Sequence, residues 1–270
     1  MTGSIGAIKV PSPGYDSGSA APQDVRDILG VDVKVWSKPR AFAELEATIA
    51  VGKHRKYAFL NAHGANLASK DAAYREVLKQ FAVMADGIGV DIASKSLYGE
   101  AFPDNLNGTD FIPGLLTHLQ RGVHVALLGA RDGIAELAVQ KLRDRHPQHR
   151  FSVVGNGYFN SEGEEIILAH LAADRPDILL VALGNPMQEK WIARRCLQEH
   201  AVVVIGVGAL FDFIAERVPR APKIWIDLRI EWLYRLLLEP RRMWRRYVLG
   251  NPVFLLRVLR QRLSKGQRRD

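Results

Sequence analysis

A carboxylate stands where catalysis in a parallel α/β sheet would need it. Asp86 follows a short apolar run at residues 82–85 and precedes Gly87 and Gly89, which let a ligand approach the backbone closely. Ligands bind outside the carboxyl ends of parallel strands, and a partly buried carboxylate can take the proton of an attacking hydroxyl. Asp86 is therefore a candidate general base. The alternative is a residue that only caps the following helix.

A second polar loop, residues 105–110, reads Asn-Leu-Asn-Gly-Thr-Asp and leads into a helix. The amide of Asn107, the hydroxyl of Thr109 and the free N–H groups of the helix start suit an anion or a sugar. A simple cap is the alternative, and it is the interpretation we favour for Asp110.

Two further strand ends suit a nucleotide or its sugar. Residues 184–191 read Gly-Asn-Pro-Met-Gln-Glu-Lys-Trp, so that the proline opens a helix whose first turn, with the Gln188 amide, could bind a diphosphate. Ordinary helix-start chemistry explains this segment except for the placement of Gln188. Residues 206–213 bring two glycines before Asp212, which could receive a hydroxyl, although helix packing explains the glycines equally well. Tyr158 offers an aromatic face to a base, or packs in the core.

The elements that must position these residues alternate along the chain. Apolar runs predict strands at residues 31–36, 57–62, 82–85, 123–129, 151–154, 177–184 and 201–208. Helical periodicity predicts helices at residues 41–51, 65–81, 89–97 and from 109 onward. The chain is thus expected to be a doubly wound α/β protein with a mainly parallel, Rossmann-like sheet.

The C-terminal part has a different character. Amphipathic helices are predicted at residues 224–238 and 252–263 without further strands. We divide the chain into a flexible lead-in (1–25), an α/β domain (26–219) and a basic amphipathic helical appendage (220–270). Residues 217–270 carry 15 Lys or Arg against 4 Asp or Glu, whereas residues 1–216 carry 22 against 25.

The charge of the appendage indicates a phosphate-rich partner. Arginines interleaved with Trp and Tyr at residues 239–247 suit an anionic membrane surface, and arginines such as Arg220 and Arg241 could grip a diphosphate. Nucleic-acid binding is the rival interpretation of the same charge. No nucleic-acid module is recognisable, so no nucleic-acid partner is expected.

Composition narrows the class further. The chain has 270 residues, ordinary globular composition and a single cysteine, which predicts no internal disulfide. The first 23 residues do not read as a signal peptide, and no run of about 18 apolar residues would span a bilayer. A cytoplasmic protein is expected, and no Cys/His cluster has metal-binding spacing.

Taken together, the loops resemble the WecG/TagA/CpsF family of bacterial glycosyltransferases over residues 56–260. The resemblance rests on five segments in order: residues 85–87, 107–110, 184–191, 206–212, and 231–235 followed by 239–242. It implies an inverting transfer from a UDP-sugar to a polyprenyl-diphosphate-linked sugar, with no metal or other cofactor. It also implies a peripheral location on the inner face of the cytoplasmic membrane, with the appendage meeting the lipid.

The resemblance also assigns roles to single residues. Asp86 matches the proposed base, Gln188 a contact of the donor diphosphate and sugar, and Asp212 a polar residue of the donor pocket. Tyr158 lies where an aromatic contacts the nucleotide, and Asn61 matches an asparagine near the active site.

Two positions depart from the family pattern: Phe59 stands where many members have Thr, and Asn105 where they have Arg. The pattern is most similar to the exopolysaccharide branch, in which glucose is added to a lipid-linked glucose, while N-acetylmannosamine transfer remains the alternative. A nucleotide-dependent oxidoreductase would share the fold but should carry a GxGxxG fingerprint, which is absent.

Overall fold

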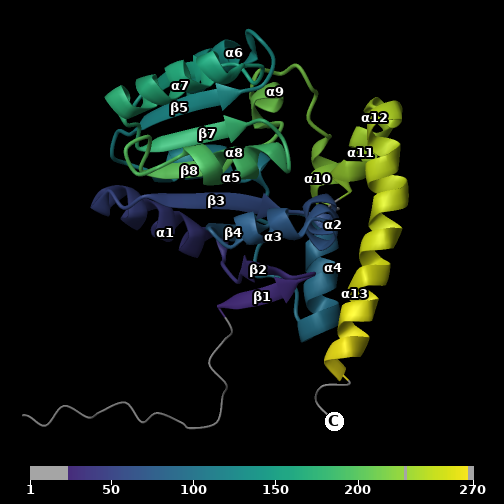
Figure 1. Ribbon diagram of the computed structural model, residues 1–270. Helices are drawn as coiled ribbons and strands as arrows, with labels where there is room; N and C mark the ends of the chain where they lie inside the picture. The colour runs from purple at the N-terminus through teal and green to yellow at the C-terminus, as the bar shows by residue number, and fades with distance from the viewer. Residues whose placement is uncertain (1–23, 228–229, 267–270) are drawn as a thin grey trace, which may run out of the picture.

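The computed structural model describes residues 24–227 and 230–266 (Figure 1). Its centre is an eight-stranded sheet in the order β1-β2-β4-β3-β8-β7-β5-β6. β1 pairs with β2 in antiparallel fashion, and the other pairings are parallel. The strands are β1 (Val25–Ile28), β2 (Val31–Lys34), β3 (Arg55–Leu60), β4 (Phe81–Ala85), β5 (His124–Gly129), β6 (Arg150–Gly155), β7 (Ile178–Ala182) and β8 (Val203–Gly206).

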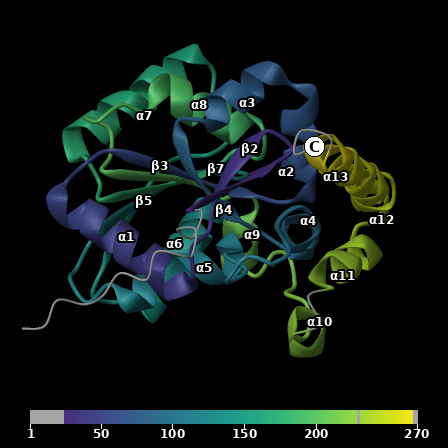
Figure 2. The same ribbon diagram turned by 90° about the horizontal axis from the view of Figure 1, so that it is seen from below.

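Helices cover both faces of this sheet, which confirms the doubly wound α/β architecture (Figure 2). One face packs against α1 (Lys38–Val51), α5 (Gly108–His118), α6 (Ile134–Arg145) and α9 (Leu210–Ile214). The other packs against α2 (Ala62–Lys70), α3 (Ala72–Leu78), α4 (Ile88–Tyr98), α7 (Ser161–Asp174) and α8 (Met187–Arg195). Every residue of β5, β7 and β8 is buried, as expected for parallel strands covered on both faces.

The appendage contains α10 (Lys223–Asp227), α11 (Glu231–Leu238), α12 (Pro240–Trp244), a π-helical turn η1 (Arg245–Leu249) and α13 (Gly250–Gly266). Phe254 and Val258 on α13 are buried where this helix crosses α2 and α4. Side-chain hydrogen bonds add to this contact: Arg257 donates to Asn66 Oδ1 at 2.7 Å, and Gln261 Nε2 donates to Asp27 Oδ2 at 2.8 Å. The long helix is therefore docked on the α/β body.

Three elements differ from the sequence predictions. β1 was not predicted; a turn with left-handed Leu29 and Gly30 folds it back onto β2. The single helix predicted for residues 65–81 is two helices, because Asp71 has extended backbone and its side chain accepts the Tyr74 N–H at 3.0 Å. The helix predicted for residues 224–238 is divided into α10 and α11. The lead-in up to residue 23 and residues 228–229 lie outside the described residues.

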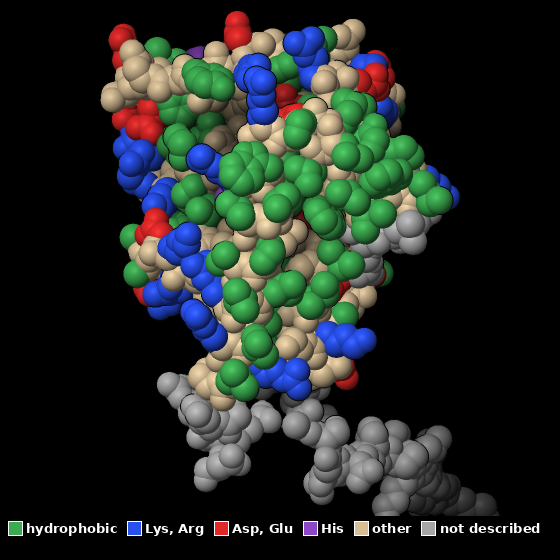
Figure 3. All heavy atoms as spheres, turned by 90° about the vertical axis from the view of Figure 1, so that its right-hand side faces the viewer, with side chains coloured by type: hydrophobic (Ala, Val, Ile, Leu, Met, Phe, Trp, Pro, Cys, Tyr) green, Lys and Arg blue, Asp and Glu red, His purple; other side chains and the backbone are tan. Residues whose placement is uncertain are grey.

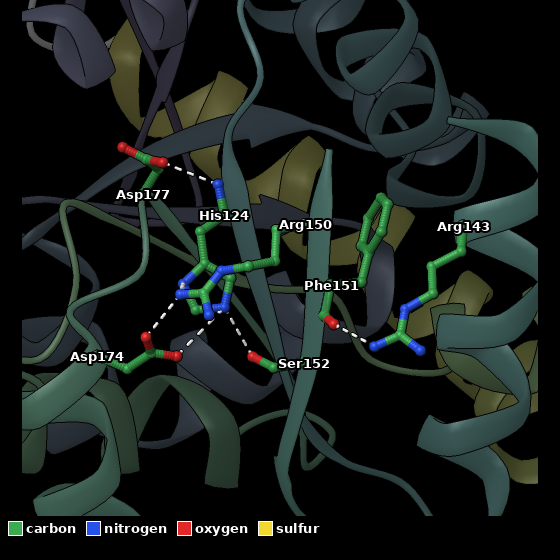
Figure 4. A network of polar contacts seen from close by, with 7 residues as sticks. All are labelled: His124, Arg143, Arg150, Phe151, Ser152, Asp174 and Asp177. Atoms are coloured by element: carbon green, nitrogen blue, oxygen red, sulfur yellow. Dashed lines mark hydrogen bonds and ion pairs between the residues drawn. The ribbon is translucent and has the colours of Figure 1, made fainter. Parts of the chain in front are cut away.

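A polar network ties together the amino ends of β5, β6 and β7, at one side of the sheet and away from the carboxyl ends (Figure 4). Arg150 at the start of β6 donates to His124 Nδ1 at 2.7 Å and to Asp174 at 2.6 Å. His124 Nε2 lies 2.8 Å from the Ser152 hydroxyl. Because Nδ1 accepts from a guanidinium, His124 is neutral here and Nε2 carries the hydrogen. Burial, with Arg150 adding to it, lowers the pKa of His124.

Candidate active site

A large cleft of about 1650 Å³ opens at the carboxyl ends of β3, β4, β7 and β8. Loops that follow these strands form its floor, and α11, η1 and the first turn of α13 form the opposite wall. Of the residues singled out from the sequence, it brings together Asn61, Asp86, Asn107, Thr109, Tyr158, Gln188 and Asp212. This is the place where parallel α/β sheets bind ligands.

Asp86 lies at the end of β4, where its N–H donates to the Leu60 carbonyl at 2.9 Å. Asn61, the first residue after β3, donates from Nδ2 to Asp86 Oδ2 at 3.2 Å. The cap position of α4 is Gly87, with φ of 88°, and no side chain caps this helix. The capping interpretation of Asp86 is therefore wrong. Its carboxylate faces the cleft and is free to act on a ligand.

The electrostatic surroundings of Asp86 suit a base. Burial raises the pKa of its carboxyl group above the ordinary range, opposed by the Asn61 hydrogen bond and by the positive charges of Arg246 and Arg235. Burial likewise raises the pKa of Glu231, a second carboxylate that lines the cleft from α11. A raised pKa increases the proton affinity of a carboxylate at neutral pH.

The two cations whose charges act on this carboxylate come from the appendage, and the sequence alone assigned a role to neither. Arg235 on α11 lies over the Phe213 ring at 4.5 Å. Arg246 in η1 has a buried Nε with no hydrogen-bond partner within the described residues. Both line the cleft, where such a group is ready for an anionic ligand. Arg235 lies in segment 231–235, which carries part of the family resemblance and could have pointed to it, whereas nothing in the sequence separates Arg246 from the other basic residues after position 216.

The two arginines named from the sequence occupy other places. Arg220 is paired with Asp110 on α5. Arg241, on α12, is exposed and is not among the residues that line the cleft. Neither has the access to the cleft that Arg235 and Arg246 have.

Asn107 caps α5, because its Oδ1 accepts the Asp110 N–H at 3.0 Å. The cap is therefore not Asp110, which lies in the first turn of the helix. The Asp110 carboxylate in turn accepts a hydrogen bond from Asn107 Nδ2 at 3.0 Å. The hydrogen bonds of Asn107 leave it on the cleft wall beside Thr109.

Gln188 is 2% exposed, and its amide is bonded within the protein. Oε1 accepts the Gly184 N–H at 3.1 Å and the Gly208 N–H at 3.0 Å, while Nε2 donates to Glu189 Oε1 at 2.7 Å. A Cβ at position 206 would lie 2.8 Å from Nε2, which explains why β8 ends in glycine. Gln188 thus joins the loops that follow β7 and β8.

Tyr158 and Asp212 also line the cleft. The Tyr158 side chain is 76% exposed and could stack on a base without displacing other groups. Asp212, in the first turn of α9, is partly buried and lines the same cavity.

The positions that depart from the family pattern have structural roles. Phe59 packs edge-on against Phe111, with ring centroids 5.8 Å apart, and a Cβ at Gly108 would lie 3.1 Å from its ring. Asn105 Oδ1 accepts the Gly87 N–H at 2.7 Å and so steadies the turn beside Asp86. Across the described ranges, no three His, Cys, Asp or Glu side chains gather as a metal-binding group.

The comparison with protein families agrees with the sequence prediction. The family model described as the glycosyl transferase WecG/TagA/CpsF family matches residues 26–268, nearly the whole chain. Membership implies a glycosyltransferase of cell-surface polysaccharide synthesis, which uses a sugar donor and a lipid-linked acceptor. Within the part of the chain that the structure describes, no helix is long and apolar enough to cross a membrane. The chain belongs to the WecG/TagA/CpsF family of glycosyltransferases.

Proposed function

We propose that the protein transfers a hexose from a UDP-sugar to a polyprenyl-diphosphate-linked sugar, with inversion at the anomeric carbon. The observation that carries this proposal is the setting of Asp86. This carboxylate lies at a strand end, caps no helix and accepts a hydrogen bond from Asn61. Its pKa is raised, and two arginines lie across the cleft.

The chemistry is a single displacement. Asp86 accepts the proton of the acceptor hydroxyl while that oxygen forms a bond to the anomeric carbon. The bond between this carbon and the diphosphate oxygen breaks on the opposite side, and its electron pair leaves with UDP. One displacement inverts the configuration, and the proton ends on Asp86.

The leaving diphosphate gathers negative charge that must be stabilised. Arg246 and Arg235 line the cleft, and the amino end of α8, with its positive helix dipole, lies at the end of β7 where Met187 also lines the cleft. We propose that these cationic and dipolar groups serve the departing UDP without a metal ion.

The appendage supports contact with a membrane. Large apolar side chains are exposed on α11, α12, η1 and α13, and Figure 3 shows them gathered on one face with Lys and Arg at its edges. These residues, here called the outer apolar face, are Leu237, Leu238, Trp244, Val248, Leu249, Val253, Leu255, Leu256, Leu259 and Leu263. An apolar patch with a basic rim suits the surface of an anionic bilayer. We propose that it rests on the inner face of the cytoplasmic membrane, where a lipid-linked acceptor can reach the cleft.

The donor sugar is proposed to be glucose, added to a lipid-linked glucose in exopolysaccharide synthesis, with an N-acetylmannosamine-type sugar as the alternative. Phe59 supports a departure from the common pattern, because an aromatic ring takes the place of a hydroxyl on the cleft wall.

The test is UDP release by the purified protein, given a panel of UDP-sugars with polyprenyl-diphosphate-linked glucose or N-acetylglucosamine. Release from one donor that requires the acceptor would support the proposal and identify the sugar. Activity abolished by a chelator would contradict the metal-free mechanism. Absence of release with every pair, from folded protein, would contradict the proposed reaction.

A further inference from the structure

A buried polar cluster lies beneath the cleft and is not used by the mechanism above. Its members are Tyr74 on α3, Asn185 before α8, and Gln188 and Glu189 on α8; we call it the α8 polar cluster. Tyr74, Gln188 and Glu189 are 1%, 2% and 0% exposed, respectively. A buried carboxylate is costly unless hydrogen bonds satisfy it, so the bonds around Glu189 indicate what the cluster does.

Three neutral donors converge on the Glu189 carboxylate. Oε1 accepts from Asn185 Nδ2 and from Gln188 Nε2, each at 2.7 Å, and Oε2 accepts from the Tyr74 hydroxyl at 3.2 Å. Burial raises the pKa of Glu189 to about 7, although the hydrogen bonds from Gln188 and Tyr74 act to lower it. The nearest cation along α8, Lys190, is instead paired with Asp71 at 2.6 Å.

These bonds fix the orientation of the Gln188 amide. Glu189 Oε1 accepts from Nε2, so Gln188 Oε1 must face the other way, towards the N–H groups of Gly184 and Gly208. A rotated amide would place NH₂ against two N–H donors and leave all of them unpaired, which is unfavourable in a buried site.

Gly184 and Gly208 each lie in a turn that forms part of the cleft floor. Gly184 has φ of 77° and Gly208 has φ of 57°, left-handed values that glycine adopts readily. Asn185 and Met187 follow the first turn, Ala209 and Asp212 follow the second, and all four line the cleft. Whatever holds Gln188 therefore sets the distance between the two loops.

The helix break at Asp71 aims Tyr74 at this cluster. Asp71 caps α3 by accepting the Tyr74 N–H at 3.0 Å and binds Lys190 on α8. Tyr74 and Lys190 thus tie α3 to α8 at two points, and the Tyr74 hydroxyl meets Glu189 between the helices.

We propose that Glu189, supported by Tyr74, is a positioning residue: it fixes the Gln188 amide and thereby holds the Gly184 and Gly208 turns in the geometry that binds the donor diphosphate. This inference rests on the proposed function for its ligand. On this proposal, residue 189 must supply an oxygen that accepts hydrogen bonds, and the negative charge of Glu189 is not required.

The experiment measures UDP affinity by calorimetry and the amide hydrogen exchange of Gly184 and Gly208 in the full chain. Glu189→Met keeps the side-chain length but removes the acceptor. We expect at least about tenfold weaker UDP binding and faster exchange at both glycines. The maximal transfer rate at saturating donor should stay within about threefold of the wild-type rate, because Asp86 is untouched.

Two further variants separate positioning from simple destabilisation. Glu189→Gln keeps a carbonyl acceptor and should bind UDP within about threefold of the wild-type affinity. Tyr74→Phe removes one donor and should weaken binding less than Glu189→Met. Tyr57→Phe is the matched control, because Tyr57 is also buried and its hydroxyl pairs with Thr48 at 3.1 Å, in a pair to which no cleft loop contributes. It should leave UDP affinity unchanged.

The outcomes distinguish the two proposals. Unchanged exchange at Gly184 and Gly208 in folded Glu189→Met, or a Glu189→Gln variant as weak as Glu189→Met, would overturn the positioning role. If Glu189→Met fails to fold, Tyr74→Phe compared with Tyr57→Phe decides the same question: equal UDP affinity and exchange in these two would overturn it. If the wild-type protein binds no UDP, the proposed donor is wrong. The amide exchange of Gly184 and Gly208 would then still show whether Glu189 holds the two turns.

Discussion

The α/β body buries most of its large apolar residues, whereas the helical appendage leaves many of its own exposed. In the body, β5, β7 and β8 are buried along their whole length, and helices cover both faces of the sheet. In the appendage, α11 has no buried residue, and α13 buries Phe254 and Val258 while exposing Leu256 and Leu259. The body buries its apolar residues in cores that Phe254 and Val258 of α13 help to complete, whereas the rest of the appendage leaves large apolar side chains exposed.

The two regions nevertheless meet in one site. The body supplies Asp86, Asn61 and the glycine turns, and the appendage supplies Arg235 and Arg246. A base fixed by a rigid sheet can keep its position. The cations that we propose serve the leaving group come from the part with the exposed apolar face. The proposed chemistry is therefore complete only when the appendage is in place.

The largest effect on stability should separate the two faces of α13. Phe254→Ala removes a buried ring between α13 and the body and should lower the free energy of unfolding by about 3–5 kcal/mol. Leu256→Ala, two residues away on the exposed face, should change it by less than about 0.5 kcal/mol. Urea unfolding of both variants measures the difference. Equal losses would show that the outer face also packs within the chain.

Arg246 should contribute to UDP binding where its neighbour does not. Arg246→Met removes a cleft-lining cation with an unpaired Nε, and we expect UDP affinity to fall by about 10- to 100-fold. Arg245→Met is the matched variant, because Arg245 is exposed and stacks on Trp244 outside the cleft. Calorimetry with UDP compares them. The role given to Arg246 fails if both variants bind UDP equally well.

Membrane contact should depend on the outer apolar face. The double substitution of Leu256→Glu and Leu259→Glu places two charges in that face and should reduce binding to anionic phospholipid vesicles at least about tenfold. Val51→Glu places a charge at an exposed apolar site on the body and should leave vesicle binding intact. Vesicle co-sedimentation measures both. UDP affinity in solution should be unchanged in the double variant.

Mild acid should act on the protein through histidines of the α/β body, since all eight histidines precede residue 217. Burial lowers the pKa of His63 to about 4 and also lowers that of His124. At these two sites the unfolded chain, whose histidines have ordinary pKa values near 6.5, binds more protons, so the stability that they contribute falls as pH drops from about 6.5 towards 4, whereas the raised pKa of Glu189, about 7, acts in the opposite direction. Each such histidine contributes at most about 1.4 kcal/mol per pH unit.

The measurement is urea unfolding between pH 7 and 5. His124→Gln should flatten the fall, because it removes one group that must take up a proton on unfolding. His170→Gln, on the exposed side of α7, serves as the control. The same pH dependence of stability in His124→Gln and in the wild type would contradict the account.

The sequence predicts the central strands well because strands buried on both faces read as continuous apolar runs, as in β5 and β7. β1 escapes that signal, since Val-Arg-Asp-Ile is short, half charged and lies at the sheet edge. The break at Asp71 escapes as well, because the helical periodicity continues through it and only the cap geometry divides α2 from α3.

The candidate site divides in the same way. Asn61, Asp86 and Asp212 follow β3, β4 and β8, so the topology of a parallel sheet brings them together, and Asn107 joins them from the loop between α4 and α5. Arg235, Arg246 and the Tyr74–Glu189 contact depend on how separate helices pack, and sequence spacing does not record that packing. The apolar spacing of residues 224–238 and 252–263 predicts amphipathic helices, but it does not tell which residues of α13 point inwards.

The most direct test of the account is the transfer rate of Asp86→Asn at saturating donor and acceptor, measured together with its UDP affinity. Asparagine keeps the size of the side chain but cannot accept the acceptor's proton. We predict a fall in transfer of about 10²- to 10⁴-fold with UDP affinity within about threefold of the wild-type value. Transfer at the wild-type rate by Asp86→Asn would contradict the assignment of Asp86 as the base.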